Sequence, residues 1–168
     1  VQARILAAHF LRAHVSFDAV YAGELVRQRD TARHLISVYR QQGEPVPELC
    51  TAPEFNEYDA RSVFMTYTNE LAEEDPAMRE DLLHIYTDTK AFDRVYEKVV
   101  RRWILGDHGR PGVPTWDAFQ ERVMGGLRRI REENGRRKRV AVFTSGGTLS
   151  AAVSAILELS AVHAMRIA

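Results

Sequence analysis

The stretch that decides the fold is VAVFTSGGTLSAAV at residues 140–153. Four apolar residues open it, and a pair of glycines bounds them, which predicts a short, fully buried strand. Beyond the glycines the apolar residues recur at helical spacing, at Leu149, Val153, Ile156 and Leu157. A helix is therefore expected there, with Thr148 or Ser150 as its candidate cap. A turn between strand and helix offers backbone N–H groups and the positive end of a helix dipole, which suits a phosphate. A plain strand-to-helix connection is the alternative.

Composition narrows the classes of function. The chain has 168 residues, 45% of them hydrophobic, and a formal net charge of zero. This length fits one domain with a real core, and neutrality argues against nucleic acid or a membrane surface as a partner. The single cysteine, Cys50, excludes internal disulfides and CxxC zinc clusters, and we expect it to be a small buried residue. The six histidines show no metal-ligand spacing, so no metal or other cofactor is expected. The absence of an 18-residue apolar run predicts a cytoplasmic protein.

Taken in order, the chain alternates short strand patterns with helical ones. Extended pieces are expected at 17–21 and 48–50, and helices at 24–41, 60–72, 76–105 with a break near 88–91, and 116–133. This order predicts a three-layer α/β/α sandwich with a mostly parallel sheet, and a helical insert over 59–115 that covers the pocket. The first residue is Val1, inside an amphipathic pattern, and few strands are visible. We therefore expect a single domain over 1–168 that is incomplete at its N-terminus and perhaps at its C-terminus.

Three stretches together resemble the histidine phosphatase superfamily, the phosphoglycerate-mutase-like proteins. VYAGELVRQRDTA at 20–32 is similar to the family's "Y-S-S-x-L-x-R-A-x-x-T-A", which puts Arg27 in the place of a phosphate-binding arginine. FNEYD at 55–59 resembles "L-x-E", whose glutamate is commonly the general acid, so that role would fall to Glu57. VFTSGG at 142–147 looks like "V-V-S-H-G-G". The helix that contains Phe119, Arg122 and Val123 fits "E-S-x-x-x-F-x-x-R-V" loosely.

Two departures from the family pattern matter for the chemistry. The "R-H-G" strand, whose histidine is phosphorylated and which is central in the family's sheet, is absent, and Ser145 replaces the second histidine. Asp107-His108-Gly109-Arg110 matches "R-H-G" only superficially, because it follows no strand. The resemblance implies a phosphohydrolase or mutase-like enzyme that acts on a small phosphomonoester through a histidine upstream of Val1. Arg27, Ser145 and Gly146 would bind the phosphate and Glu57 would donate the proton.

Other functions stay open at this stage. A non-catalytic member of the same fold would keep the phosphate pocket and bind a phosphorylated ligand without chemistry. A phosphosugar-binding module of the sugar isomerase type and an asparaginase-like turn fit the Thr/Ser/Gly stretch at 144–148, but neither accounts for Arg27 or Glu57. The substrate and the oligomeric state are not determined by the sequence, and a homodimer is an open alternative to a monomer.

Overall fold

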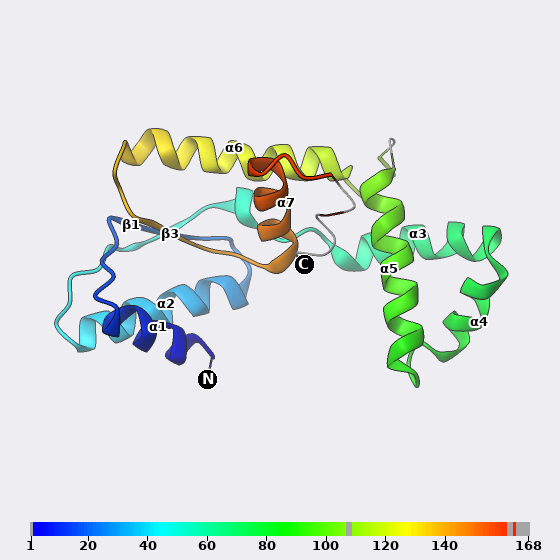
Figure 1. Cartoon of the computed structure of the whole chain (residues 1–168), viewed down its shortest axis with the longest axis horizontal. Helices are drawn as coiled ribbons and strands as arrows, with labels where there is room; N and C mark the ends of the chain where they lie inside the picture. The colour runs from blue at the N-terminus through cyan, green and yellow to red at the C-terminus, as the bar shows by residue number, and fades with distance from the viewer. Residues whose placement is uncertain (1, 107–108, 161–162, 164–168) are drawn as a thin grey trace. The chain divides into compact units, whose positions relative to one another are not determined.

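The computed structural model describes residues 2–106, 109–160 and 163, and shows a mixed α/β protein (Figure 1). The elements are α1 (Gln2–Arg12), β1 (Ala19–Ala22), α2 (Val26–Gln41), β2 (Leu49–Thr51), the 3-10 turn η1 (Pro53–Phe55), α3 (Ala60–Glu74), α4 (Pro76–His84), α5 (Thr89–Leu105), α6 (Trp116–Asn134), β3 (Val140–Phe143) and α7 (Gly146–Ile156). The chain divides into two compact units. The first unit comprises residues 1–57 and 122–149, and the second unit comprises residues 58–121 and 150–168.

The sheet belongs to the first unit and is parallel throughout. Its strand order is β2-β1-β3, and the register pairs Val20 with Leu49 on one side and Ala19 with Val140 on the other. All of β1 is buried, as expected for the middle strand of a parallel sheet. β3 is only half-buried, which corrects the prediction of a fully buried strand, because among the described residues β3 has a single neighbouring strand.

The pairing of β1 with β3 limits where the family's "R-H-G" strand, which is central in the family's sheet, could join the sheet of this chain. Four residues of β1 are in register with four residues of β3, from Ala19↔Val140 to Ala22↔Phe143. The central position in the described sheet is therefore held by β1. A further strand could join this sheet without breaking a hydrogen-bonded ladder only at the outer edge of β2 or of β3.

Helices cover both faces of the sheet in the first unit, which gives the three layers predicted from the sequence. On one face the alternate β1 residues Val20 and Ala22 pack with α1 and α2, in a core completed by Ala7, Ala32, Leu35, Ile36 and Tyr39. The residue between them points to the other face, because side chains alternate along a strand. There the Tyr21 hydroxyl donates to Glu133 Oε2 at 2.9 Å and accepts from Asn134 Nδ2 at 3.0 Å, at the end of α6.

Helix α6 approaches the segment after β2 closely. A Cβ on Gly126 would lie 2.7 Å from Glu54 Cβ and 3.0 Å from Phe55 Cζ, so this position of the helix has no room for a side chain. Arg129, one turn further along, donates to both carboxylate oxygens of Glu54 at 2.7 and 3.1 Å. These contacts fix the segment that leads to Glu57, within the first unit.

The second unit is helical and includes the segment predicted as a helical insert. Three aspartates cap its helices through their carboxylates: Asp59 accepts from Ser62 N, Asp75 from Ala77 N, and Asp88 from Lys90 N. The interruption between α4 and α5 therefore covers 85–88, slightly earlier than predicted, because Asp88 is the N-cap of α5, which begins at Thr89. The core of this unit is aromatic, with Trp103 packed against Tyr58, Trp116 and Phe119.

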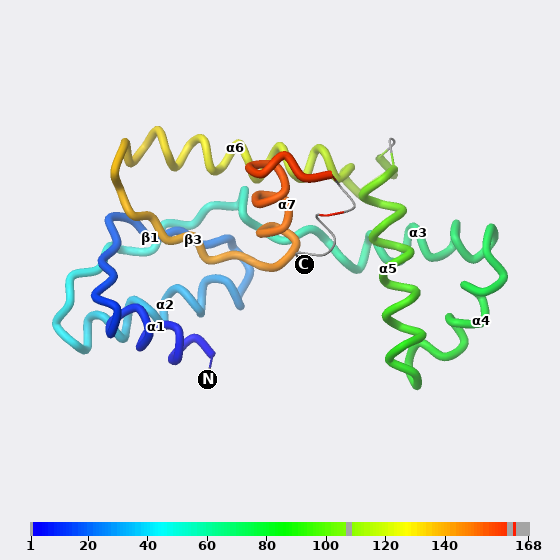
Figure 2. Tube along the Cα trace, viewed as in Figure 1, coloured from blue at the N-terminus to red at the C-terminus, as the bar shows by residue number. Residues whose placement is uncertain are grey.

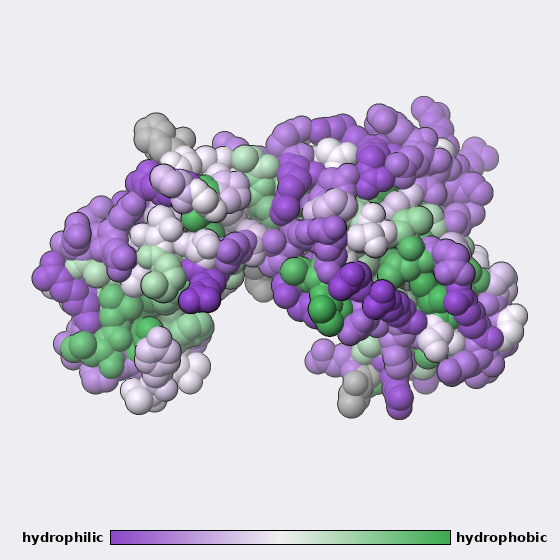
Figure 3. Space-filling model, turned by 180° about the vertical axis from the view of Figure 1, so that it is seen from behind, coloured by the Kyte–Doolittle hydropathy of each residue, from purple (hydrophilic) through white to green (hydrophobic). Residues whose placement is uncertain are grey.

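The surface of the second unit also carries apolar side chains. Figure 3 shows hydrophobic (green) residues among hydrophilic ones on the part formed by α3, α4 and α5. The large apolar residues exposed on these helices include Met65, Leu83, Phe92 and Leu105. They are interspersed with ion pairs such as that between Arg94 and Asp81.

Candidate functional site

The candidate site is built from three segments of the first unit that follow the strands of the parallel sheet. The chain passes from β1 to α2, from β2 through η1 to α3, and from β3 directly into α7 (Figure 2). These three connections carry Glu24, Glu57 and Ser145, and Arg27 lies in the first turn of α2. The carboxyl ends of parallel strands lie at one edge of a sheet, where open α/β folds bind their ligands. Arg27, Glu57 and Ser145 all belong to the first unit.

Arg27 and Ser145 are in direct contact although 118 positions separate them. Arg27 Nε donates a hydrogen bond to Ser145 Oγ at 3.1 Å. Arg27 lies in the first turn of α2, where a cation is unfavourable for the helix dipole, and that turn contains no acidic residue. Within the described ranges neither Nη atom of Arg27 has a hydrogen-bond partner, so most of its planar fork remains available to an anion.

Gln28 is part of this arrangement and was not among the residues predicted from the sequence. Its side chain is buried, and its Nε2 donates to Ser145 Oγ at 2.9 Å and to the backbone carbonyl of Phe55 at 3.1 Å. Helical periodicity could have found it, because Gln28 shares the buried face of α2 with Ala32, Leu35, Ile36 and Tyr39. A polar residue on such a face requires an internal partner.

Glu57 lies at the beginning of α7. Its Oε2 accepts a hydrogen bond from the backbone N–H of Gly147 at 3.0 Å, so a carboxylate occupies the positive end of this helix. Gly146, the predicted phosphate contact, is the first residue of α7. The predicted caps were wrong: α7 begins two residues before Thr148, whose hydroxyl instead donates to the Asn56 carbonyl at 3.2 Å, and Ser150 lies further inside the helix.

The loop that carries Glu57 is held from both sides. Asn56 Nδ2 donates to Glu24 Oε2 at 2.8 Å, while its own Oδ1 accepts from the Glu24 backbone N–H at 2.6 Å. Arg122 Nη2 donates to the Asn56 carbonyl at 2.7 Å. Partial removal from water lowers the pKa of the Arg122 guanidinium, and the carboxylates of Glu57 and Glu54 oppose this shift.

The ion pair next to this loop also shifts a pKa. The hydrogen bonds from Arg129 lower the pKa of the Glu54 carboxyl, against the smaller opposing effect of burial. The pair therefore keeps Glu54 ionised at the base of the Glu57 loop.

Other residues considered in the sequence lie elsewhere. His9, His34 and His84 are on α1, α2 and α4, and His34 lies about two turns beyond Arg27 on α2. Cys50 is exposed on β2, which corrects the expectation of burial, because its strand is at an edge of the described sheet. The loop histidine His108 lies outside the described residues.

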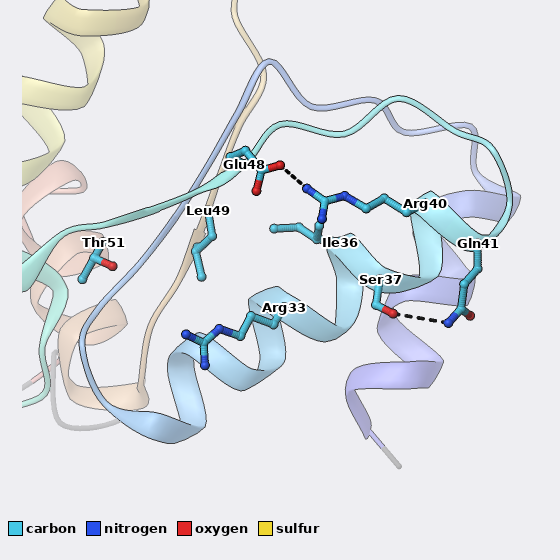
Figure 4. A pocket seen from close by; sticks show the side chains of 8 residues that line it. All are labelled: Arg33, Ile36, Ser37, Arg40, Gln41, Glu48, Leu49 and Thr51. Carbon is cyan, nitrogen blue, oxygen red and sulfur yellow. Dashed lines mark hydrogen bonds and ion pairs between the residues drawn. The ribbon is translucent and has the colours of Figure 1, made fainter.

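A cleft of about 580 Å³ lies between α2 and β2 in the first unit, and none of the predicted site residues lines it. Figure 4 shows two arginines in this cleft, Arg33 and Arg40, of which Arg40 pairs with Glu48. Its lining contains no residue of the three segments described above, so we do not assign it to the site.

Among residues 2–106, 109–160 and 163, no group of three or more His, Cys, Asp or Glu side chains is arranged to hold a metal ion. Each described helix is too short or too polar to span a bilayer.

Comparison with known proteins identifies the family. The family model of the histidine phosphatase superfamily (branch 1) matches residues 1–168. A candidate alpha-ribazole-5'-P phosphatase from Escherichia coli K-12 is similar in structure, with a TM-score of 0.58 and 23% identity over 98% of this chain and 68% of its own. A phosphoglycerate mutase from Bacillus anthracis strain Sterne gives a TM-score of 0.57 and 15% identity over 91% of this chain and 64% of its own. No curated protein sequence matches the chain.

The chain thus spans about two thirds of the length of each of these two solved proteins. At these identities the likeness to them establishes the fold, and the family match covers the whole sequence. The chain belongs to the histidine phosphatase superfamily, branch 1.

Proposed function

We propose that the protein binds a small phosphomonoester at the Arg27–Ser145 site and transfers its phosphoryl group, as a phosphohydrolase or a mutase-like enzyme. The observation that carries this proposal is the contact of the Arg27 guanidinium with the Ser145 hydroxyl, immediately before the N-terminus of α7. A guanidinium fork, a hydroxyl and helix N-terminal amides are the donors that recognise phosphate. Family membership supports the same substrate class.

Each residue has a distinct role in this proposal. Arg27 pairs with two phosphoryl oxygens through its Nη groups, Ser145 donates one hydrogen bond, and the backbone N–H of Gly146 completes the cradle. Glu57 is the proton donor to the leaving oxygen. Unlike an imidazolium, Ser145 adds no positive charge, so Arg27 carries most of the charge stabilisation.

The nucleophile in this proposal is a histidine from outside the 168-residue chain. Its ring nitrogen attacks phosphorus, an N–P bond forms, and the P–O bond to the leaving group breaks as Glu57 gives its proton to the leaving oxygen. Water then attacks the phosphohistidine, the N–P bond breaks, and the Glu57 carboxylate takes the proton of the attacking water. The products are an alcohol and inorganic phosphate, and Glu57 is protonated again.

A second candidate function is binding without catalysis. It is favoured by the replacement of the expected second histidine by Ser145, whose Oγ already accepts hydrogen bonds from Arg27 and Gln28. Such a protein would recognise a phosphorylated ligand at the same site and leave its phosphate ester intact.

The first test is hydrolysis of p-nitrophenyl phosphate by the full-length protein, together with binding of inorganic phosphate by calorimetry. Arg27→Ala should lower kcat/KM about 100-fold, as expected for removal of a charged donor from the transition state. Arg33→Ala is the matched control, since Arg33 lies on the same helix with a largely exposed side chain and is expected to leave activity unchanged. Equal phosphate affinity in wild type and Arg27→Ala would refute both candidate functions.

The role of Glu57 and the choice between the two functions need separate measurements. Glu57→Gln should reduce kcat more than it reduces phosphate affinity, because protonation matters in the transition state. Unchanged turnover would remove Glu57 from the acid role. An acid-labile phosphoprotein trapped by rapid quenching would support the phosphohistidine route, whereas phosphate binding without turnover or trapping would favour the non-catalytic function.

A further inference from the structure

The buried carboxamide of Gln28 occupies a defined place beside the candidate phosphate site. The side chain is 2% exposed, and its Nε2 has two short contacts to acceptors, Ser145 Oγ at 2.9 Å and the Phe55 carbonyl at 3.1 Å. The Thr144 hydroxyl also donates to the Phe55 carbonyl, at 2.8 Å, so the lone pairs of that oxygen are both used. A reversed amide would turn Oε1 toward the Phe55 carbonyl, acceptor against acceptor, so the network fixes which way the amide faces.

The Oε1 end of the carboxamide is held by close packing against Gly23. Gln28 Oε1 is buried and has no hydrogen-bond partner among the described residues, and a Cβ placed on Gly23 would lie only 2.1 Å from it. The backbone of Gly23 thus closes the space behind the amide. Because rotation would also break both Nε2 hydrogen bonds, Gln28 has a single orientation in this site.

This orientation determines what the Ser145 hydroxyl can do. A serine oxygen has two lone pairs and one hydrogen. Arg27 Nε at 3.1 Å and Gln28 Nε2 at 2.9 Å both donate to Ser145 Oγ, so both lone pairs are taken. The hydroxyl hydrogen then points away from both side chains and is left for an acceptor that enters the site.

We infer that Gln28 is a positioning residue that sets Ser145 as a hydrogen-bond donor to a phosphoryl oxygen. This inference rests on the proposed phosphomonoester site. It adds how Ser145 binds phosphate at the position where the family has an imidazole. The donor is neutral, since neither an amide nor a serine hydroxyl ionises near neutral pH. The Gln28–Ser145 pair therefore adds no titrating group between about pH 6 and 8, a range in which the phosphate ligand itself changes charge.

The test is a double-mutant cycle on inorganic phosphate affinity in the full-length protein, with Gln28→Met and Ser145→Ala. Methionine nearly keeps the length and volume of glutamine but lacks the amide donors, and circular dichroism checks that each variant is folded. Ser145→Ala should weaken phosphate binding about tenfold, the effect of one hydrogen bond to a charged group. Gln28→Met alone should weaken binding roughly three- to tenfold, and the double variant should bind no more weakly than Ser145→Ala.

A purely structural role for Gln28 would give a different cycle. Gln28→Met would then weaken binding by the same factor in wild type and in the Ser145→Ala variant, and that additivity would overturn the inference. Gln28→Glu provides a second variant of the same shape, with an acceptor where Nε2 donates. It should weaken phosphate binding at least as much as Gln28→Met, and an unchanged affinity would also overturn the inference.

Arg27→Ala distinguishes failure of the proposed phosphate site from failure of the proposed role of Gln28. If Arg27→Ala abolishes phosphate binding while Gln28→Met has no effect, the site stands and only the role of Gln28 is refuted. If wild type itself binds no phosphate, the proposed function and this inference fail together.

Discussion

Replacing Gly23 by alanine should destabilise the first unit, because the space for a Cβ is already filled. The new atom would lie 2.1 Å from Gln28 Oε1, 2.8 Å from the Phe55 carbonyl oxygen and 2.9 Å from Asn56 Oδ1. Gly23 is not in the left-handed region, so the substitution introduces no backbone strain of its own, and the cost arises from crowding.

The magnitude follows from what the Gln28 amide must give up. To reach an ordinary contact distance it has to move by more than about 1 Å, which breaks its hydrogen bonds to Ser145 and Phe55, at about 1 kcal/mol each. Overpacking against the less mobile Phe55 carbonyl adds about 1 kcal/mol or more, and the lower chain entropy of alanine in the unfolded state returns about 0.5 kcal/mol. We expect the free energy of unfolding to fall by about 2–3 kcal/mol.

The assay combines urea denaturation, followed by far-UV circular dichroism, with hydrogen exchange of the β1 amides. Both tryptophans of the sequence, Trp103 and Trp116, belong to the second unit, so their fluorescence reports on that unit separately. The exchange of β1 should accelerate in Gly23→Ala, because β1 ends immediately before Gly23.

A second substitution tests directly whether the Gln28 amide is what crowds a side chain at position 23. In a Gln28→Ala background the 2.1 Å overlap disappears, so Gly23→Ala should cost at least about 1 kcal/mol less there than in wild type. Strictly additive effects of the two substitutions would show that the Gln28 amide is not what Gly23 accommodates.

Three further outcomes are expected. Glu54→Gln should lower stability by about 1 kcal/mol at about pH 7, because Arg129 loses one of its two charged partners and keeps only Glu133. Since the pKa of folded Glu54 is below its unfolded value, its contribution is present above about pH 4.5 and is lost as the pH falls through the folded pKa. Urea midpoints from about pH 7 to 3 should therefore fall less steeply in the variant, and parallel curves would contradict this pairing. Asp59→Ala removes the cap on Ser62 N and should cost about 1 kcal/mol, seen by tryptophan fluorescence, whereas Asp59→Asn should retain most of it. Gly126→Ala should cost about 1–3 kcal/mol, because its Cβ would lie 2.7 Å from Glu54 Cβ, and an unchanged urea midpoint would argue against this close approach.

Much of the fold could be predicted because local patterns determine it. The apolar run at 140–143 and the helical patterns at 24–41 and 116–133 each locate an element within a few residues, and the parallel sheet follows from the alternation of strand and helix patterns. Strand burial was harder to predict, because it depends on how many neighbours a strand has. β1, with two paired neighbours, is fully buried, while the more apolar-looking β3 is not.

Only those residues of the candidate site that fall within family motifs could be predicted from the sequence. Arg27 and Ser145 were named from the sequence, and the structure brings them into contact. The helical period of α2 places Gln28 on its buried face, but no local pattern indicates its partner Ser145, which lies more than a hundred positions away. The start of α7 was misplaced for a related reason: Thr148 bonds to Asn56 rather than to its own helix.

The pairing of β1 with β3 also has a consequence for biosynthesis. Ala19 pairs with Val140, so 121 further residues must be made before β1 acquires its second neighbour. At ordinary rates of translation this takes roughly ten seconds. During that interval one edge of an apolar strand stays open on the ribosome-bound chain, a period in which a chaperone would protect it. The anion site appears later still, since Ser145 follows β3, so the nascent protein cannot bind phosphate at this site until nearly the whole 168-residue sequence has been synthesised.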